Sequence, residues 1–139
     1  MAGGRPSGPK EHCGGRWTRA RKRSFITSLL RQGTRRWAPI TDVDRAATTK
    51  RGFRLCAECK QEVPVTTREG GKKVKNTFVD HIVPIVPPEK GFTSWDNFIE
   101  GLFCEEDNLQ VLCRECHTSK SNEERAIAAQ RRDNEKETK

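Results

Sequence analysis

The sequence is poor in hydrophobic residues. Of 139 residues, 32% are hydrophobic and 33% are charged. Because this is a thin supply of core for the length, we expect a metal ion or a partner to stabilise the fold. No run of 18 apolar residues occurs, so no membrane-spanning helix is expected. A basic helix could still lie on an anionic membrane, but we expect nucleic acid and no membrane as its partner. The segment MAGGRPSGPK lacks the apolar stretch of a secretory signal, so we expect a cytoplasmic protein.

The cysteines indicate a metal site. Four of the six form two C-x-x-C pairs, Cys56/Cys59 in LCAECK and Cys113/Cys116 in LCRECH. Without an export signal, two such pairs favour zinc over disulfides, since four thiolates complete a tetrahedron around one ion. Structural Zn²⁺ would then supply folding energy. Two unrelated thiol pairs, or one redox pair, are the alternatives. The 53 residues between the pairs exceed a compact zinc ribbon, so they contain an insertion.

The other two cysteines are expected to lie outside this site. Cys104 ends an apolar helical stripe and is predicted to be a buried thiol rather than a fifth zinc ligand. Cys13 lies in a Gly- and Pro-rich segment and is predicted to be a free thiol in a mobile tail.

Positive charge is concentrated in the first part of the chain. Residues 1–54 hold 14 Lys or Arg and three Asp or Glu, a net +11, whereas residues 55–139 hold 13 and 16, a net −3. Such asymmetry favours a nucleic-acid partner, although a solvated basic tail with no specific partner is the alternative. The predicted phosphate-contacting residues in this region are Arg19, Arg21, Lys22, Arg23, Arg35 and Arg36.

Periodicity predicts a series of short elements. A basic amphipathic helix is expected within residues 16–37, ending near Gly33, and a second possible helix begins at Thr41. Residues 65–73 read as a loop with a turn at Gly70-Gly71, and residues 74–83 as a strand. The stripe in TSWDNFIEGLFC predicts a helix capped by Thr93 or Ser94. DNLQVLC reads as a strand, and the chain from Arg114 as a helix.

Polar residues recur in a distinctive order inside the cysteine bracket. Asp80-His81 stand in VDHIVP, Asn108 opens DNLQVLC, and His117 follows Cys116 in CRECHTSK. With these motifs the chain resembles the HNH endonucleases, and it is similar to small HNH proteins of tailed bacteriophages. The resemblance runs from about residue 24 to 124 and is strongest over 78–120.

The resemblance implies a fold and a division into domains. The fold would be small α+β, a ββα-metal (treble-clef-like) core bracketed by a four-cysteine zinc site and preceded by a basic helical extension. We expect a disordered tail over residues 1–15, the basic extension over 16–52, the nuclease domain over 53–133 and a frayed end over 134–139.

The resemblance also assigns roles to residues. His81 would be the general base, and Asp80 and His117 would hold a catalytic Mg²⁺, Mn²⁺, Ni²⁺ or Zn²⁺. Asn108 would pin the loop between the two strands so that His81 stays aimed. An imidazole with a pKa of about 7 is a suitable base for this hydrolysis, and the catalytic metal needs a site open to water and substrate.

Each assignment has a plainer alternative. His81 could be a surface histidine, His117 an extra residue of the zinc knuckle, and Asn108 a turn cap. Lys120, one turn after His117, could reach a phosphate or could equally be a solvated helix residue. Moreover, neighbouring residues of a strand point to opposite faces, so Asp80 and His81 share one site only if the strand ends or twists there.

The expected function is therefore metal-dependent cleavage of double-stranded DNA, by nicking or by double-strand cutting, with 5′-phosphate and 3′-hydroxyl products. A phage terminase or portal is a possible partner by resemblance, in a bacterial host cytoplasm. The alternative is a non-catalytic four-cysteine zinc module that binds nucleic acid without cutting it.

Overall fold

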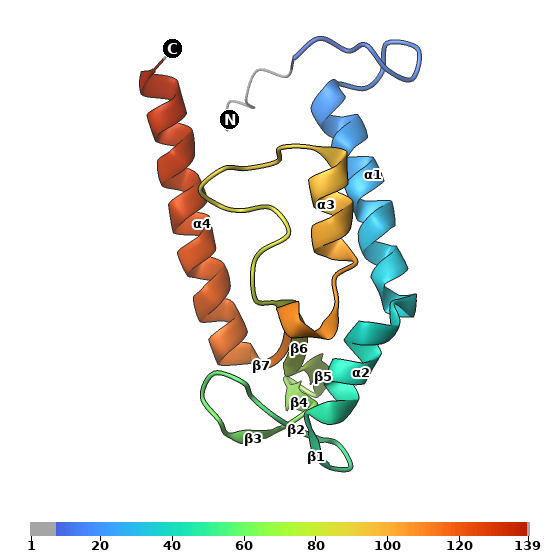
Figure 1. The fold of residues 1–139 in the computed structure, drawn as a ribbon, viewed down its shortest axis with the longest axis vertical. Coiled ribbons are helices and arrows are strands. Elements are labelled where there is room, and N and C mark those ends of the chain that lie inside the picture. Colours follow the sequence, from blue (N-terminus) through green and yellow to red (C-terminus); the bar gives the residue numbers. More distant parts are fainter. Residues whose placement is uncertain (1–7, 139) are drawn as a thin grey trace. The chain divides into compact units, whose positions relative to one another are not determined.

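The computed structural model describes residues 8–138, which form a small mixed α/β protein (Figure 1). The chain divides into two compact units, one ending at Arg36 and the other beginning at Trp37. Each unit is treated by itself below. The predicted domain boundary after residue 52 stays a prediction, as does the disordered tail, of which residues 1–7 lie outside the described part of the chain.

The first unit consists of a turn and a basic helix. An isolated β-bridge joins His12 and Trp17. Helix α1 (Arg19–Gly33) follows, capped by the Thr18 hydroxyl, which accepts a hydrogen bond from the Arg21 N–H. It ends at Gly33 as predicted, and a 3-10 turn, η1 (Thr34–Arg36), follows. None of the α1 residues is fully buried.

The second unit opens with helix α2 (Ala38–Ala46), which begins three residues before the predicted start at Thr41. Pro39 in its first turn explains the earlier start. The fixed φ of proline is helical, and an N–H in the first turn has no partner within the helix, so its absence costs nothing there. The Trp37 indole donates a hydrogen bond of 2.7 Å to the Cys104 carbonyl. This bond ties the start of α2 to the segment after α3.

Short strands form two small antiparallel sheets after α2. The first contains β1 (Thr48–Lys50), β2 (Phe53–Leu55) and β3 (Glu62–Pro64) in sequence order. The second is a hairpin of β4 (Thr66–Glu69) and β5 (Lys72–Lys75). The loop predicted over residues 65–73 is therefore wrong, although the Gly70-Gly71 turn is confirmed, with φ of 55° and 79°.

The third sheet is a ribbon of two antiparallel strands, β6 (Thr77–His81) and β7 (Leu109–Cys113). The strand predicted over 74–83 is split at Asn76, whose side-chain amide donates to the Pro64 carbonyl at 2.9 Å. The Asn76 N–H donates to the Val65 carbonyl, in register with β4–β5, and the Asn76 carbonyl accepts the Arg114 N–H, in register with β6–β7. Helix α4 (Arg114–Glu137) follows β7 directly.

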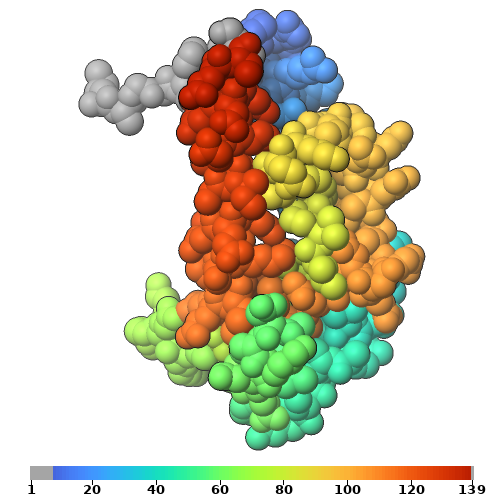
Figure 2. Space-filling model, turned by 60° about the vertical axis from the view of Figure 1, so that its left-hand side comes forward, coloured from blue at the N-terminus to red at the C-terminus, as the bar shows by residue number. Residues whose placement is uncertain are grey.

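Helix α3 (Trp95–Leu102) lies between β6 and β7 in the chain, and a 3-10 turn, η2 (Glu106–Asn108), leads into β7. The Ser94 hydroxyl caps α3 by accepting the Asn97 N–H, which confirms one of the two predicted caps. Figure 1 shows the long segment after β6 running between α3 and α4, and Figure 2 shows it against α4. Arg131 of α4 donates to the Pro88 carbonyl of this segment at 3.2 Å.

The core is small, as the composition predicts. Its buried hydrophobic residues, among those described, are Cys56, Phe98, Leu102, Leu109, Val111, Leu112 and Cys113. Two of these are cysteines of the C-x-x-C pairs, so the metal site and the core are one region. No helix within residues 8–138 is both long and apolar enough to span a bilayer.

Candidate active site and metal centre

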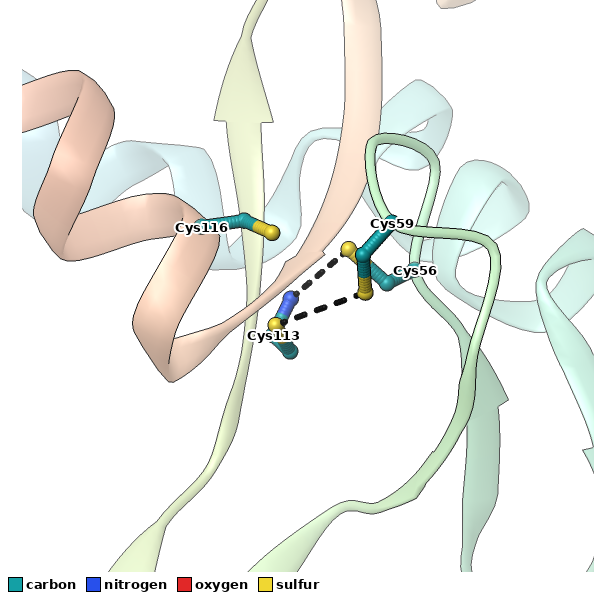
Figure 3. A group of neighbouring side chains, drawn as sticks. All are labelled: Cys56, Cys59, Cys113 and Cys116. Atoms are coloured by element: carbon teal, nitrogen blue, oxygen red, sulfur yellow. Dashed lines mark hydrogen bonds between the residues drawn. The ribbon is translucent and has the colours of Figure 1, made fainter.

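Four cysteine sulfurs converge at one end of the second unit. The ligand atoms of Cys56, Cys59, Cys113 and Cys116 all lie within 4.8 Å of one another. Figure 3 shows the first two on the loop after β2 and the others at the end of β7 and the start of α4. Zn–S bonds of about 2.3 Å put tetrahedral sulfurs about 3.8 Å apart, and the Cys59 and Cys113 sulfurs are 3.9 Å apart. The cysteines therefore fit a zinc ion.

Backbone hydrogen bonds shape the first knuckle. The Lys60 N–H donates to the Cys56 carbonyl and the Cys56 N–H donates to the Gln61 carbonyl, both at 3.0 Å. Closing this tight turn puts Lys60 at φ 62°, the left-handed region that few residues with a β carbon adopt. The Cys113 N–H then donates to the Cys56 sulfur at 3.4 Å. The two knuckles are thus joined by backbone as well as by the sulfurs.

Cys56 and Cys116 differ in their readiness to ionise. Burial by itself raises the pKa of Cys56, but N–H groups of Cys113, Cys59 and Glu58 outweigh it and lower the pKa to about 6. The neighbouring Cys113 thiol, with burial, raises the pKa of Cys116 to about 12. Because only thiolates ligate zinc, loading the site displaces protons.

Cys104 and Cys13 lie outside this group. Cys104 is half-buried, and burial is the main cause that raises the pKa of its thiol. Cys13 is exposed, at a positive φ of 54°.

The predicted catalytic residues lie at the far end of the β6–β7 ribbon. His81 pairs with Leu109 and Asp80 with Gln110 in a regular antiparallel register. The His81 Nε2 atom is 3.0 Å from the Leu102 carbonyl oxygen. A carbonyl only accepts hydrogen bonds, so Nε2 carries the proton and a neutral ring has its lone pair on Nδ1.

Asn108 fastens the turn that follows His81. Its Oδ1 accepts the Val83 N–H at 2.8 Å and its Nδ2 donates to the Val83 carbonyl at 3.3 Å. The Ile82 N–H donates to the Asn108 carbonyl at 2.9 Å. Three hydrogen bonds thus fix the chain just past His81, the position where the sequence predicted a pin.

Asp80 and His117 lie where β6 meets α4. The Asp80 carboxylate forms an ion pair with Lys120, with Oδ2 and Nζ 2.8 Å apart. The His117 ring stacks on Phe78, with centroids 4.4 Å apart and planes inclined by 15°. Phe78 and Asp80 are two residues apart on β6, so they share the face toward α4. His81 belongs to the opposite face, toward α3.

The predicted residues therefore do not form a closed metal cage. Within residues 8–138, the cysteine set is the one group of three or more His, Cys, Asp or Glu ligand atoms that lie within 4.8 Å of one another. Asp80 and His117 offer two ligands from facing elements, which suits a site completed by water and phosphate oxygens. Their metal-binding role stays a prediction.

The predicted DNA-binding residues fall into two settings. The six that belong to the first unit are all exposed, four on α1 and two in η1. The Arg21 guanidinium lies 4.7 Å from the centroid of the Trp17 ring, whose edge meets Phe25. Lys120 is different, because its side chain is only 25% exposed and is directed at Asp80.

Two features of the site were missed by sequence reasoning. Glu124 contacts Lys120 at 2.7 Å, and its spacing of four residues along α4 could have revealed it. The β4–β5 hairpin, which the ion pair of Glu69 with Arg114 joins to the start of α4, carries four exposed basic residues. Their density around Gly70-Gly71 could have revealed a basic surface. They are Arg68, Lys72, Lys73 and Lys75.

Comparison with known protein families finds a match to part of the chain. Residues 56–123 match the family model described as HNH endonuclease. The match begins at the first cysteine of the metal site and includes Asp80, His81, Asn108 and His117. This match confirms the resemblance to the HNH endonucleases and indicates a nuclease or nucleic-acid-binding function. Neither the curated proteins nor the solved structures provide a match.

Proposed function

We propose that this protein is a metal-dependent endonuclease that hydrolyses phosphodiester bonds of DNA at the end of the β6–β7 ribbon. The observation that carries the proposal is the tautomer of His81, which its hydrogen bond with Leu102 sets. Its Nε2 proton is committed to the Leu102 carbonyl, so Nδ1 is the proton acceptor. A neutral imidazole of this kind is a suitable base for water at pH 7.

The other residues have supporting roles in this proposal. Asn108 holds the backbone of the turn beyond His81, while the Leu102 carbonyl orients the His81 ring. Asp80 and His117 would hold a divalent ion, which when bound supplies positive charge to the phosphate and the leaving oxygen. The antiparallel β6–β7 pair followed directly by α4 supports a ββα-metal core.

The opposite faces of Asp80 and His81 limit where the phosphate can lie. β6 ends at His81, and the chain turns away at Ile82 and Val83. A phosphate across this strand end can be approached from both faces, whereas one over the middle of either face cannot. We therefore place the scissile phosphate beyond the end of β6.

Several finer parts of the proposal rest on resemblance alone. They are the phage origin, a bacterial cytoplasmic location and a terminase or portal partner. The exposed basic residues of the first unit support double-stranded DNA as the substrate, since they offer sequence-independent phosphate contacts. Nicking and double-strand cutting remain alternative outcomes.

A second candidate function is nucleic-acid binding without cleavage. The ion pair between Asp80 and Lys120 favours it, because an ammonium group already occupies one oxygen of the predicted metal ligand. In this case the four cysteines would stabilise the fold, the basic residues would bind the nucleic acid, and His81 would have no chemical role.

A supercoiled-plasmid assay tests the proposal. The zinc-loaded protein is freed of other metals and supplied with Mg²⁺ or Mn²⁺. Loss of a general base costs about 10²–10⁴-fold in rate, so we expect His81→Ala to cut at least about 100-fold more slowly while still binding DNA. His12→Ala, in the first unit, is the matched control and should cut normally. Equal cutting by His81→Ala, or DNA binding without cutting by every variant, contradicts the proposal.

A further inference from the structure

Lys120 joins the two consecutive residues on which the proposed chemistry depends. Its Nζ atom lies 2.8 Å from Asp80 Oδ2 and 2.9 Å from the His81 carbonyl oxygen. A third oxygen, Glu124 Oε1, lies 2.7 Å away. The contact with Asp80 is an ion pair outside hydrogen-bond geometry, while the other two are hydrogen bonds. The ammonium thus has one oxygen neighbour for each of its three protons.

These contacts make Lys120 a fixed charge. The side chains of Lys120, Asp80 and Glu124 are 25%, 20% and 32% exposed, respectively. Ion pairs this sheltered are screened less by salt than exposed pairs are. The two carboxylates and the His81 carbonyl therefore hold the Lys120 ammonium in place.

The position of Lys120 on α4 connects it with His117. The residues His117, Lys120 and Glu124 follow one another at spacings of three and four, so they share one face of the helix. That face lies over β6, because His117 stacks on Phe78 and Lys120 pairs with Asp80. A single helical face thus presents one predicted metal ligand and contacts the other.

We propose that Lys120 is a positioning residue, which orients the Asp80 carboxylate and the His81 backbone for cleavage, with Glu124 as its counter-charge. This inference rests on the proposed function. Carboxylates that ligate metals are themselves held by neighbouring groups, and loss of such a group costs about 10–100-fold in metal affinity or activity. Lys120 makes this kind of contact to Asp80 and also secures the strand end where His81 lies.

A phosphate contact is the competing role for Lys120. It would require the ammonium to leave three oxygens, two of which carry negative charge. The two roles predict different effects of removing the charge. Removing a phosphate-binding group weakens DNA binding and leaves turnover intact, whereas removing a positioning residue lowers turnover and metal affinity and leaves DNA binding intact.

The test compares Lys120→Met, which keeps the length of the side chain, with Lys136→Met on the exposed last turn of α4. The zinc-loaded proteins are assayed for kcat and KM on plasmid, for DNA affinity without added divalent metal, and for Mn²⁺ binding by electron paramagnetic resonance. We expect Lys120→Met to lose about 10–100-fold in kcat and in Mn²⁺ affinity. DNA affinity should stay unchanged, and Lys120→Arg, which keeps the charge, should recover part of kcat.

Several outcomes would overturn the inference. Wild-type kcat and Mn²⁺ affinity in Lys120→Met would do so, as would weaker DNA binding with unchanged kcat. If Lys120→Met does not fold, Glu124→Gln tests the same network, and a kcat equal to that of the wild type counts against it. If the wild type does not cut, the proposed function fails as well. If the wild type cuts and Lys120→Met cuts equally, only the positioning role fails.

Discussion

Gly91 lies directly against the guanidinium group of Arg131. A β carbon built on Gly91 would stand 2.4 Å from Arg131 Nη1, and the glycine has a φ of +76°. Arg131 also donates to the Pro88 carbonyl, three residues before Gly91. This arginine therefore holds the segment after β6 against α4, and it depends on the missing side chain of Gly91.

We predict that Gly91→Ala destabilises the fold. A left-handed φ costs an alanine about 1–2 kcal/mol, and displacement of Arg131 adds to this, for a total of about 2–4 kcal/mol. Gly70→Ala is the control, because Gly70 also has a positive φ, 55°, but has no atom within 4 Å of an added β carbon. Urea unfolding measures both. Equal losses in the two variants would show that Arg131 simply moves aside.

Removal of one exposed zinc ligand should separate metal binding from packing. Cys59 is exposed, whereas Cys56 is fully buried, so Cys59→Ser removes a thiolate with little change in the core. We expect loss of bound zinc and destabilisation by several kcal/mol, since zinc binding supplies folding energy in small domains. Metal content and thermal unfolding are the measurements, with Cys13→Ser as the control. Undiminished zinc in Cys59→Ser would remove this cysteine from the site.

Truncation of Asn108 should affect both stability and cleavage. Asn108→Ala removes both side-chain hydrogen bonds to Val83, which costs about 1–3 kcal/mol, and frees the turn beyond His81. We expect a lower kcat with unchanged DNA affinity, because no DNA contact is assigned to this amide. Asn122→Ala, exposed on α4, is the matched control. A normal kcat in Asn108→Ala would mean that cleavage does not depend on the hydrogen bonds between Asn108 and Val83.

The basic residues of α1 should set the salt dependence of DNA binding. Removing one side chain that neutralises a phosphate reduces the slope of log K against log salt by about 0.9. We therefore expect Arg19→Ala with Lys22→Ala to reduce the slope by up to about 2. The control is Arg125→Ala with Arg132→Ala, which removes the same charge from exposed positions on α4. If the two pairs lower the slope equally, net charge rather than α1 governs binding.

The sequence was most informative where a pattern repeats within a few residues. The α3 stripe and the two C-x-x-C pairs are local, and both predictions are confirmed. The β4–β5 hairpin escaped prediction because its residues are mostly polar and partly or fully exposed. The hairpin is defined by backbone pairing and by the glycine turn, and its sequence shows no alternation of apolar and polar residues. Period-based reasoning has nothing to detect in such a hairpin.

The sequence proposed the residues of the candidate site, and the structure shows how they are arranged. Asp80 and His81 lie on opposite faces of the ribbon, as the alternation of side chains along a strand requires. For Lys120 the sequence left a phosphate contact and a solvated position as equal alternatives, and its partner Asp80 lies 40 residues earlier in the chain. Contacts over such distances depend on how α4 packs on β6, and no local pattern encodes that packing.

Cys116 and His117 are consecutive residues in the first turn of α4. An ion bound by the four cysteines would therefore also hold the rotation of this helix, and with it the direction of His117 and Lys120. A newly synthesised chain without zinc would hold that face against β6 only by the Lys120–Asp80 ion pair and the stacking of His117 on Phe78. The proposed cutting activity would then rise as zinc is acquired, so that metal supply, as well as synthesis, would determine when DNA is exposed to it.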